Sequence, residues 1–311
     1  MINTTLEIQE LIDLWIENID VREKTKNQYN RIIRYFFKWI IERNINERTI
    51  ANTHVIEYKK FVIDTNNETT ARLYLIIVKM FYAWIYNNDY CTTHIAKDIK
   101  LPKFDNGFRR FPLTLEQAQQ LMRTCNQKTP KGMRDYAIIS LMLSSGLRRI
   151  EIIRLNIGDL SIQNNKNILW IQGKGKFEKQ PIGIGENTLQ AIQDYISNFN
   201  EIDDDQPLFR GTSGRNKYGR LHPDYLSHLI KKKLHEIGLG TAMNKRYYSC
   251  HSLRHTAATL LMQDNCDIYT IQKLLRHRNI QTSELYLKLI SKTISFDNPH
   301  IKQLDKLLSI N

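Results

Sequence analysis

Cysteine is scarce in this chain: four of the 311 residues are cysteines, and no two of them stand in a C-x-x-C spacing. This pattern excludes a small secreted framework of disulfides, and we expect free thiols in a reducing cytoplasm. The hydrophobic runs are too short and too interrupted to span a bilayer, and the amino terminus lacks a basic region followed by an apolar run. We therefore expect no membrane segment and no signal peptide.

The cysteines also give little support to a metal site. Cys250 and Cys266 flank His251 and His255, and this set includes possible zinc ligands. Structural zinc sites usually pair their ligands at short fixed spacings, whereas here Arg254 stands among the ligands in a helical pattern. The sequence therefore favours another role for these histidines, and we predict no metal.

Acidic residues are too few to balance the basic ones. The chain has 45 Lys and Arg against 32 Asp and Glu, a formal charge of +13. Residues 1–112 have a net charge of +3 and the remainder +10. This excess indicates a polyanionic partner such as DNA or RNA, although many soluble basic proteins bind no nucleic acid.

The apolar pattern divides the chain into a helical part and a mixed part. Apolar residues recur at helical spacing in four segments between residues 6 and 90, which predicts a small bundle. Pro102, Gly107 and Pro112 break the pattern within residues 97–112. This segment contains five basic residues and two acidic ones, and we expect it to be a linker.

Beyond the linker the sequence predicts mainly helices and one β-hairpin. A capping box at Thr114 opens the first helix, and Gly146 ends the helix that begins at Arg134. Two strands between residues 168 and 184 flank a glycine-rich turn. Further helices are expected at Arg149–Leu155, Glu186–Ser197, Pro223–Ile237, Ser252–Met262, Ile268–Leu275 and around Thr282–Leu289.

Two arginines in this part, Arg148 and Arg254, are candidates for holding a phosphate. Attack at phosphorus concentrates negative charge on the non-bridging oxygens, which preorganised donors stabilise. A guanidinium suits this role because it is planar, permanently charged and able to bind two oxygens. His251 lies one helical turn before Arg254, and Glu151 lies one turn after Arg148. Taken alone, Arg148 would be read as a surface residue or helix cap, whereas His251-x-x-Arg254 is a stronger signal, with a helix start carrying incidental polar residues as its alternative.

A lysine, a second histidine and a tyrosine complete the groups that phosphoryl transfer to a tyrosine requires. Lys174 lies between two glycines at the hairpin turn, and we expect it to protonate the leaving oxygen, with Lys176 as a rival. His277 lies nine residues before Tyr286 and would donate a hydrogen bond to a non-bridging oxygen. Tyr286 would be the nucleophile, and only the whole set distinguishes it among 15 tyrosines.

In order and spacing these residues resemble the tyrosine recombinase (phage integrase) family, in a compact Xer-type or simple integrase form without an arm-binding domain. The family pattern has an arginine followed three residues later by an acid, a hairpin lysine, His-x-x-Arg, a His or Trp, and a tyrosine nine residues further on. The matching positions are Arg148, Glu151, Lys174, His251, Arg254, His277 and Tyr286, with His255 as a supporting residue.

The resemblance implies a fold and a division into domains. The fold is mainly α with a small β-hairpin or sheet in the catalytic domain, and its two lobes form a DNA clamp. The regions are a helical core-binding (SAM-like) domain at 1–96, a basic interdomain linker at 97–112, a catalytic domain at 113–290, and a tail with an oligomerisation helix at 291–311.

The resemblance also implies a mechanism and partners. Tyr286 would form a 3′-phosphotyrosine and release a 5′-hydroxyl, which then attacks on a partner duplex, with no metal, ATP or other cofactor. Members of the family work as tetramers on paired double-stranded DNA sites through a Holliday junction. We expect a homotetramer on DNA built by exchange of the C-terminal helix, possible accessory directionality factors, and integration or excision of a mobile element or resolution of dimers.

Basic side chains outside the catalytic set are candidate DNA contacts, which position a protein on the duplex without reading its sequence. They are Lys24, Lys26, Arg31, Lys59, Lys103, Arg109, Arg110, Lys176 and Arg276. Arg276 is also a departure from the family, because a glycine is common at that place. Two alternatives stay open: a catalytically silent DNA-binding protein of the same fold, and a relaxase similar to type IB topoisomerases.

Overall fold

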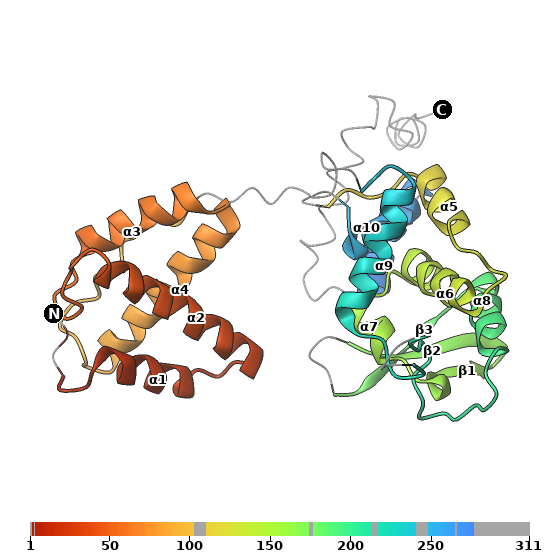
Figure 1. Ribbon diagram of the computed structural model, residues 1–311, viewed down its shortest axis with the longest axis horizontal. Helices are drawn as coiled ribbons and strands as arrows, with labels where there is room; N and C mark the ends of the chain where they lie inside the picture. Colours follow the sequence, from red (N-terminus) through yellow and green to blue (C-terminus); the bar gives the residue numbers. More distant parts are fainter. Residues whose placement is uncertain are drawn as a thin grey trace, which may run out of the picture. The chain divides into compact units, whose positions relative to one another are not determined.

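The computed structural model describes residue 2 and residues 4–102, 110–173, 177–212, 217–240, 248–264 and 266–276. Contacts between Cα atoms divide the chain into two compact units, Met1–Asn106 and Gly107–Asn311 (Figure 1). Several predictions fall outside the described residues. They concern Lys103, Arg109, Lys174, Lys176, His277, Tyr286, the helix expected around Thr282–Leu289 and the tail at 291–311.

The first unit is a bundle of helices, as the apolar spacing predicted. Its helices are α1 (Ile8–Asn18), α2 (Glu23–Ile41), α3 (Asn52–Thr65) and α4 (Glu68–Asn87). Each turns an apolar face inward, and the core is rich in aromatic side chains such as Trp15, Phe36 and Phe81. Within the described part of the chain, no helix is both long and apolar enough to cross a membrane.

The first residues of the segment predicted as a linker pack on this bundle. Lys79 of α4 donates hydrogen bonds to the carbonyls of Lys97 and Ile99, at 2.6 and 2.9 Å. Arg72 donates to the carbonyl of Pro102 at 2.8 Å, and the Ile99 side chain is buried in the core. Two long basic side chains thus satisfy carbonyls that have no helical partner, and residues 97–102 are held against α4.

The second unit is mainly helical. It contains α5 (Leu115–Arg123), α6 (Pro130–Ser145), α7 (Arg149–Arg154), α8 (Glu186–Ile196), α9 (Pro223–Glu236), α10 (Cys250–Gln263), α11 (Ile268–Leu275) and the 3-10 turn η1 (Ile157–Asp159). The Thr114 capping box is confirmed, with the Gln117 amide donating to Thr114 Oγ1 at 3.2 Å. Helix α6 begins four residues earlier than predicted, because Thr129 caps it and Pro130 occupies its first turn.

A three-stranded antiparallel sheet contains the predicted hairpin and one strand more. Its order is β1 (Leu160–Gln163), β2 (Lys166–Gln172) and β3 (Lys179–Gly183). Strand β1 was not predicted because it has only four residues; Asn164 and Asn165, both at positive φ, turn the chain from β1 into β2. The expected fold class, mainly α with a small sheet, is confirmed. Helix α10 packs against α6 and α9 (Figure 1).

Candidate active site

The end of α6 places Arg148 at the beginning of α7. Gly146 ends α6 in the left-handed conformation, with φ 56°, as the sequence predicted. A Cβ atom on Gly146 would lie 2.7 Å from Leu275 Cδ2, so a larger residue here would force the Leu275 side chain to shift. Arg254 of α10 is buried, and its guanidinium donates to the carbonyls of both Gly146 and Leu275. The ends of α6 and α11 therefore meet at Arg254.

Glu151 is a buried carboxylate that binds two arginines. Its Oε1 accepts from Arg148 Nη1 at 2.9 Å, which confirms the expected pairing across one helical turn. Its Oε2 accepts from the Arg148 amide at 2.8 Å and from Arg276 Nη2 at 2.9 Å. Burial alone would raise the pKa of Glu151, but the charge of Arg276 and the hydrogen bonds from Arg148 outweigh it and hold the pKa below its ordinary value.

Arg276 occupies a backbone conformation that usually selects glycine. It caps α11 with φ 53°, and its Nη1 donates to the carbonyl of Leu274 at 2.6 Å. Its side chain is 14% exposed, and burial lowers the pKa of the guanidinium although Glu151 opposes the shift. The departure from glycine is thus accompanied by an ion pair. A phosphate contact by Arg276 stays a prediction, because its Nη2 faces Glu151 in this structure.

His251 lies in a strongly positive environment at the beginning of α10. Its side chain reaches solvent, yet neighbouring protein atoms partly desolvate the ring. Desolvation and the like charges of Arg254, Arg149, Arg110 and Arg148, in that order, lower its pKa. The structure therefore brings Arg148, at the start of α7, close to His251 and Arg254 of α10.

Arg149 is a member of this cluster that the sequence reasoning missed. Its Nη1 donates to Ser227 Oγ on α9 and lies 3.9 Å from a carboxylate oxygen of Asp224. The available signal was the pair Arg148-Arg149 at the start of a helix, because adjacent residues there place two guanidiniums in the same region. Arg110, predicted as a DNA contact, is half-buried and also acts on His251.

The hairpin is tied to α7 just before its turn. Arg154 Nη1 donates at 3.3 Å to the carbonyl of Gly173, the residue that follows β2. Gly173 directly precedes Lys174 in the sequence, so this contact holds the last described residue before that predicted catalytic lysine. His255 on α10 is half-buried.

The basic residues predicted on the first unit differ in their surroundings. Lys24 and Arg31 are exposed on α2 and lie seven residues apart, so they share a face. Lys59 on α3 is half-buried, and Lys26 donates to the carbonyl of Glu17 at 3.0 Å. Lys24 and Arg31 are therefore the members of this group that are most accessible to a phosphate from solvent.

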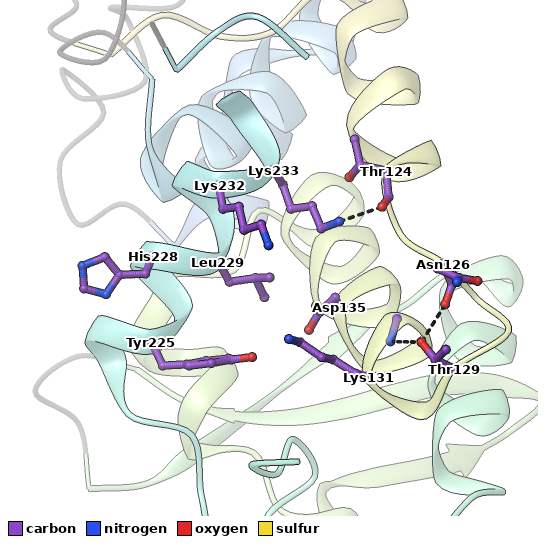
Figure 2. A pocket seen from close by; sticks show the side chains of 11 residues that line it. Thr124, Asn126, Thr129, Lys131, Asp135, Tyr225, His228, Leu229, Lys232 and Lys233 are labelled. Atoms are coloured by element: carbon purple, nitrogen blue, oxygen red, sulfur yellow. Dashed lines mark hydrogen bonds between the residues drawn. The ribbon is translucent and has the colours of Figure 1, made fainter. Parts of the chain in front are cut away.

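A separate basic cavity of about 410 Å³ lies between α6 and α9. Figure 2 shows Lys131 and Lys232 directed into the space from the two helices, with Tyr225 lying across one side. Lys233 Nζ, also at the edge, donates to the carbonyl of Thr124 at 2.6 Å. Among the described residues predicted to act in catalysis, Arg148, His251 and Arg254 do not line this cavity, and we place the candidate active site at those three residues instead.

The chemistry of the cluster suits an oxyanion. Arginine and histidine are hydrogen-bond donors for phosphate oxygens, and the positive charges of Arg148, Arg149 and Arg254 outnumber the carboxylates of Glu151 and Asp224 beside them. Among the residues that the structure describes, no group of three or more His, Cys, Asp and Glu side chains could hold a metal ion.

Comparison with known proteins connects this geometry to a family. The model of the phage integrase family matches residues 112–292. A tyrosine recombinase of Synechococcus elongatus is 28% identical over 84% of this chain and 83% of its own length. The tyrosine recombinase XerC of Caldanaerobacter subterraneus is 33% identical over 67% of this chain and 56% of its own.

A solved structure shows the same fold. The XerH site-specific recombinase, bound to its palindromic difH substrate in a post-cleavage complex, superposes with a TM-score of 0.71 at 18% identity. The match covers 91% of this chain and 83% of XerH. With a family model matching more than half of its length, the chain belongs to the phage integrase family and is a tyrosine site-specific recombinase.

Proposed function

We propose that the chain cuts and rejoins DNA through a covalent bond between Tyr286 and the 3′ side of the cut. The phenolic oxygen of Tyr286 loses its proton to solvent and attacks phosphorus, the bond from phosphorus to the 5′ oxygen breaks, and Lys174 gives that oxygen a proton. Arg148, Arg254, His251 and His277 stabilise the charge on the non-bridging oxygens. A 5′-hydroxyl then attacks the phosphotyrosine, restores the phosphodiester and releases Tyr286.

One observation carries this assignment: Arg148 is far from His251 and Arg254 in sequence, yet the three meet at one positive site. Arg254 binds the carbonyl of Gly146, two residues before Arg148, and the charges of both arginines act on His251. Such a site is preorganised, because its arginines are fixed by Glu151 and by backbone carbonyls before any phosphate arrives.

The proposed substrate is a pair of double-stranded recombination sites. XerH is described in a post-cleavage complex with its difH site, and the net charge of +13 of this chain favours a polyanion. We further propose that four copies assemble on two sites by exchanging the C-terminal segment, pass through a Holliday junction, and serve a mobile element or the resolution of dimers.

A nicked suicide substrate tests the chemistry. Duplexes that the protein binds are selected from randomised DNA, and a nick beside the cleavage position lets the short product strand escape. Wild-type protein should become covalently attached to DNA, and Tyr286→Phe should not. Tyr269→Phe is a matched control, because Tyr269 is an exposed tyrosine on α11, and this variant should react like the wild type.

Two alternative functions are outcomes of the same experiments. Binding without any covalent product from the wild type would indicate a silent DNA-binding protein of this fold. Covalent attachment without resolution of a synthetic four-way junction would indicate a relaxase that never pairs two sites. The proposal requires both attachment and resolution.

A further inference from the structure

Helix α11 is attached to the rest of the unit by few apolar contacts and several polar ones. Only two side chains of α11, Ile271 and Leu275, are buried in the small core that it shares with α10. Two arginines add polar contacts to the rest of the unit: Arg254 of α10 donates to the Leu275 carbonyl, and Arg276 at the end of α11 donates to Glu151 of α7. A further bond from Arg276 to the Leu274 carbonyl lies within the end of α11 itself. The position of the end of α11 therefore depends on charged contacts.

The contact between Arg276 and Glu151 joins residues 125 positions apart. Glu151 is fully buried, Arg276 is 14% exposed and Arg148 is 28% exposed by side chain. The three groups form a chain in which the carboxylate lies between the two guanidiniums, and Arg148 is the end that opens to solvent. A ligand phosphate would meet this chain at Arg148.

Charge balance gives Arg276 a role at that open end. Glu151 and Arg148 alone would form a neutral pair, and the carboxylate would compete with a phosphate for the donors of Arg148. With Arg276 the group has a net charge of +1, and one carboxylate oxygen is shared with a second cation. Arg148 Nη1 binds the other oxygen, so the carboxylate fixes its direction without neutralising the group.

We propose that Arg276 is a positioning residue for Arg148: it binds Glu151, keeps the group positive, and docks the end of α11 beside the site. The inference rests on the proposed function, and it differs from a direct phosphate contact by Arg276. In sequence, His277 follows Arg276 directly and Tyr286 comes ten residues after it. A correctly docked α11 thus fixes the point from which the chain leads to both predicted catalytic groups.

The test is a double-mutant cycle on Arg276 and Glu151, measured as the single-turnover rate of covalent complex formation at saturating nicked DNA. Arg276→Gly is the informative variant, because glycine accepts a φ of 53° without strain and any loss then belongs to the side chain. Arg276→Gly should slow the rate about tenfold or more, but less than about threefold when Glu151→Gln is already present. Arg276→Lys should restore part of the rate.

A neighbouring basic residue is the matched control. Lys273 is exposed in the last turn of α11, so Lys273→Ala removes the same charge near the same helix end without touching Glu151. The inference predicts that Arg276→Gly changes the affinity for DNA by less than about twofold and slows cleavage, while Lys273→Ala does not slow cleavage.

Two results would overturn the inference. One is a loss of cleavage rate in Arg276→Gly that is equally large with and without Glu151→Gln, together with DNA binding that is weaker and less dependent on salt. A direct phosphate contact by Arg276 would produce that result. The other is a wild-type rate in Arg276→Gly. Either result leaves the proposed function standing as long as the wild type forms the covalent complex; a wild type that forms none refutes the proposed function itself.

Discussion

At the scale of single residues, the site shows how one buried carboxylate organises several cations. Glu151 receives three hydrogen bonds, two from Arg148 and one from Arg276, and its side chain has no exposed surface. Donated hydrogen bonds and the charge of Arg276 favour the ionised carboxylate, so the pKa of Glu151 lies below its ordinary value despite burial.

The stability that Glu151 contributes should depend on pH in one direction. Its pKa in the folded chain lies below the ordinary value of 4.5, so its contribution is present above about pH 4.5 and is lost as the pH falls through the folded pKa. Near pH 7, Glu151→Gln should lower the free energy of unfolding by about 3–5 kcal/mol. Urea denaturation from pH 7 to pH 3.5 checks this, and a difference that does not shrink in acid would contradict it.

His251 should titrate below its ordinary pKa of 6.5, because desolvation and nearby arginines disfavour the charged ring. Arg149→Ala removes one of these like charges and should move the pKa upward. NMR titration of the His251 ring protons measures the shift, and Arg43→Ala in the first unit is a control that should leave it unchanged. A His251 pKa that is lower in Arg149→Ala than in the wild type would refute this electrostatic description.

The sequence suggested candidate members of the site but not the contacts between distant ones. Arg148, Glu151, His251 and Arg254 were found from short local spacings, which helix geometry converts into shared faces. The contact between Arg276 and Glu151 was not foreseen, because it joins residues 125 positions apart and depends on how α11 docks. Arg149 was overlooked because one arginine of an adjacent pair is enough to satisfy the motif.

At the scale of elements, the turn at Gly146 determines how closely α6 and α11 approach. Two constraints disfavour a side chain at Gly146: its positive φ of 56°, and the 2.7 Å distance from a Cβ atom there to Leu275 Cδ2. Gly146→Ala should therefore cost both left-handed strain, about 1–2 kcal/mol, and a collision with the end of α11. Thermal unfolding should show a loss of stability larger than either constraint alone explains.

Two other glycines serve as controls that separate backbone strain from the contact with Leu275. Gly238 has a φ of 80°, but a Cβ atom there would meet no atom within 4 Å, so Gly238→Ala carries strain alone. Gly183→Ala meets neither condition and should be nearly neutral. The expected order of destabilisation is Gly146 first, Gly238 second and Gly183 last; an equal loss at Gly146 and Gly238 would show that the contact with Leu275 is unimportant.

Element prediction succeeded where the signals were long or chemically specific. The helices were visible in their apolar spacing, and the cap at Thr114 and the stop at Gly146 were read from single residues. Strand β1 was missed because four residues give no reliable alternation. The Asn164-Asn165 turn was its one usable signal, since asparagine accepts the positive φ that tight hairpins need.

At the scale of the whole molecule, the chain has two compact units with separate hydrophobic cores. The second unit contains the predicted catalytic cluster, and its part of the sequence has most of the excess positive charge. The sequence therefore indicated a polyanionic partner, and its candidate catalytic residues fall in the second unit. It did not reveal that residues 97–102 are bound by Arg72 and Lys79, because these hydrogen bonds depend on tertiary structure.

Assembly on DNA gives a prediction at the same scale. The sequence after Pro299 contains Leu304, Leu307 and Leu308 at helical spacing, and we expect this segment to join neighbouring copies. Deleting residues 300–311 should abolish cooperative assembly on paired sites while a single site still binds one copy. Gel-shift titration measures the cooperativity, and unchanged cooperativity would refute the exchange of this segment.

The central claim is that Tyr286 bonds to DNA at a site built from Arg148, His251 and Arg254. The most direct measurement is mass spectrometry of the covalent complex after digestion of both protein and DNA. The claim predicts one modified peptide, with a nucleotide 3′-phosphate on Tyr286, and its absence when Arg148 or Arg254 is replaced by alanine. A nucleotide attached to any other side chain, or attachment that persists without either arginine, would contradict it.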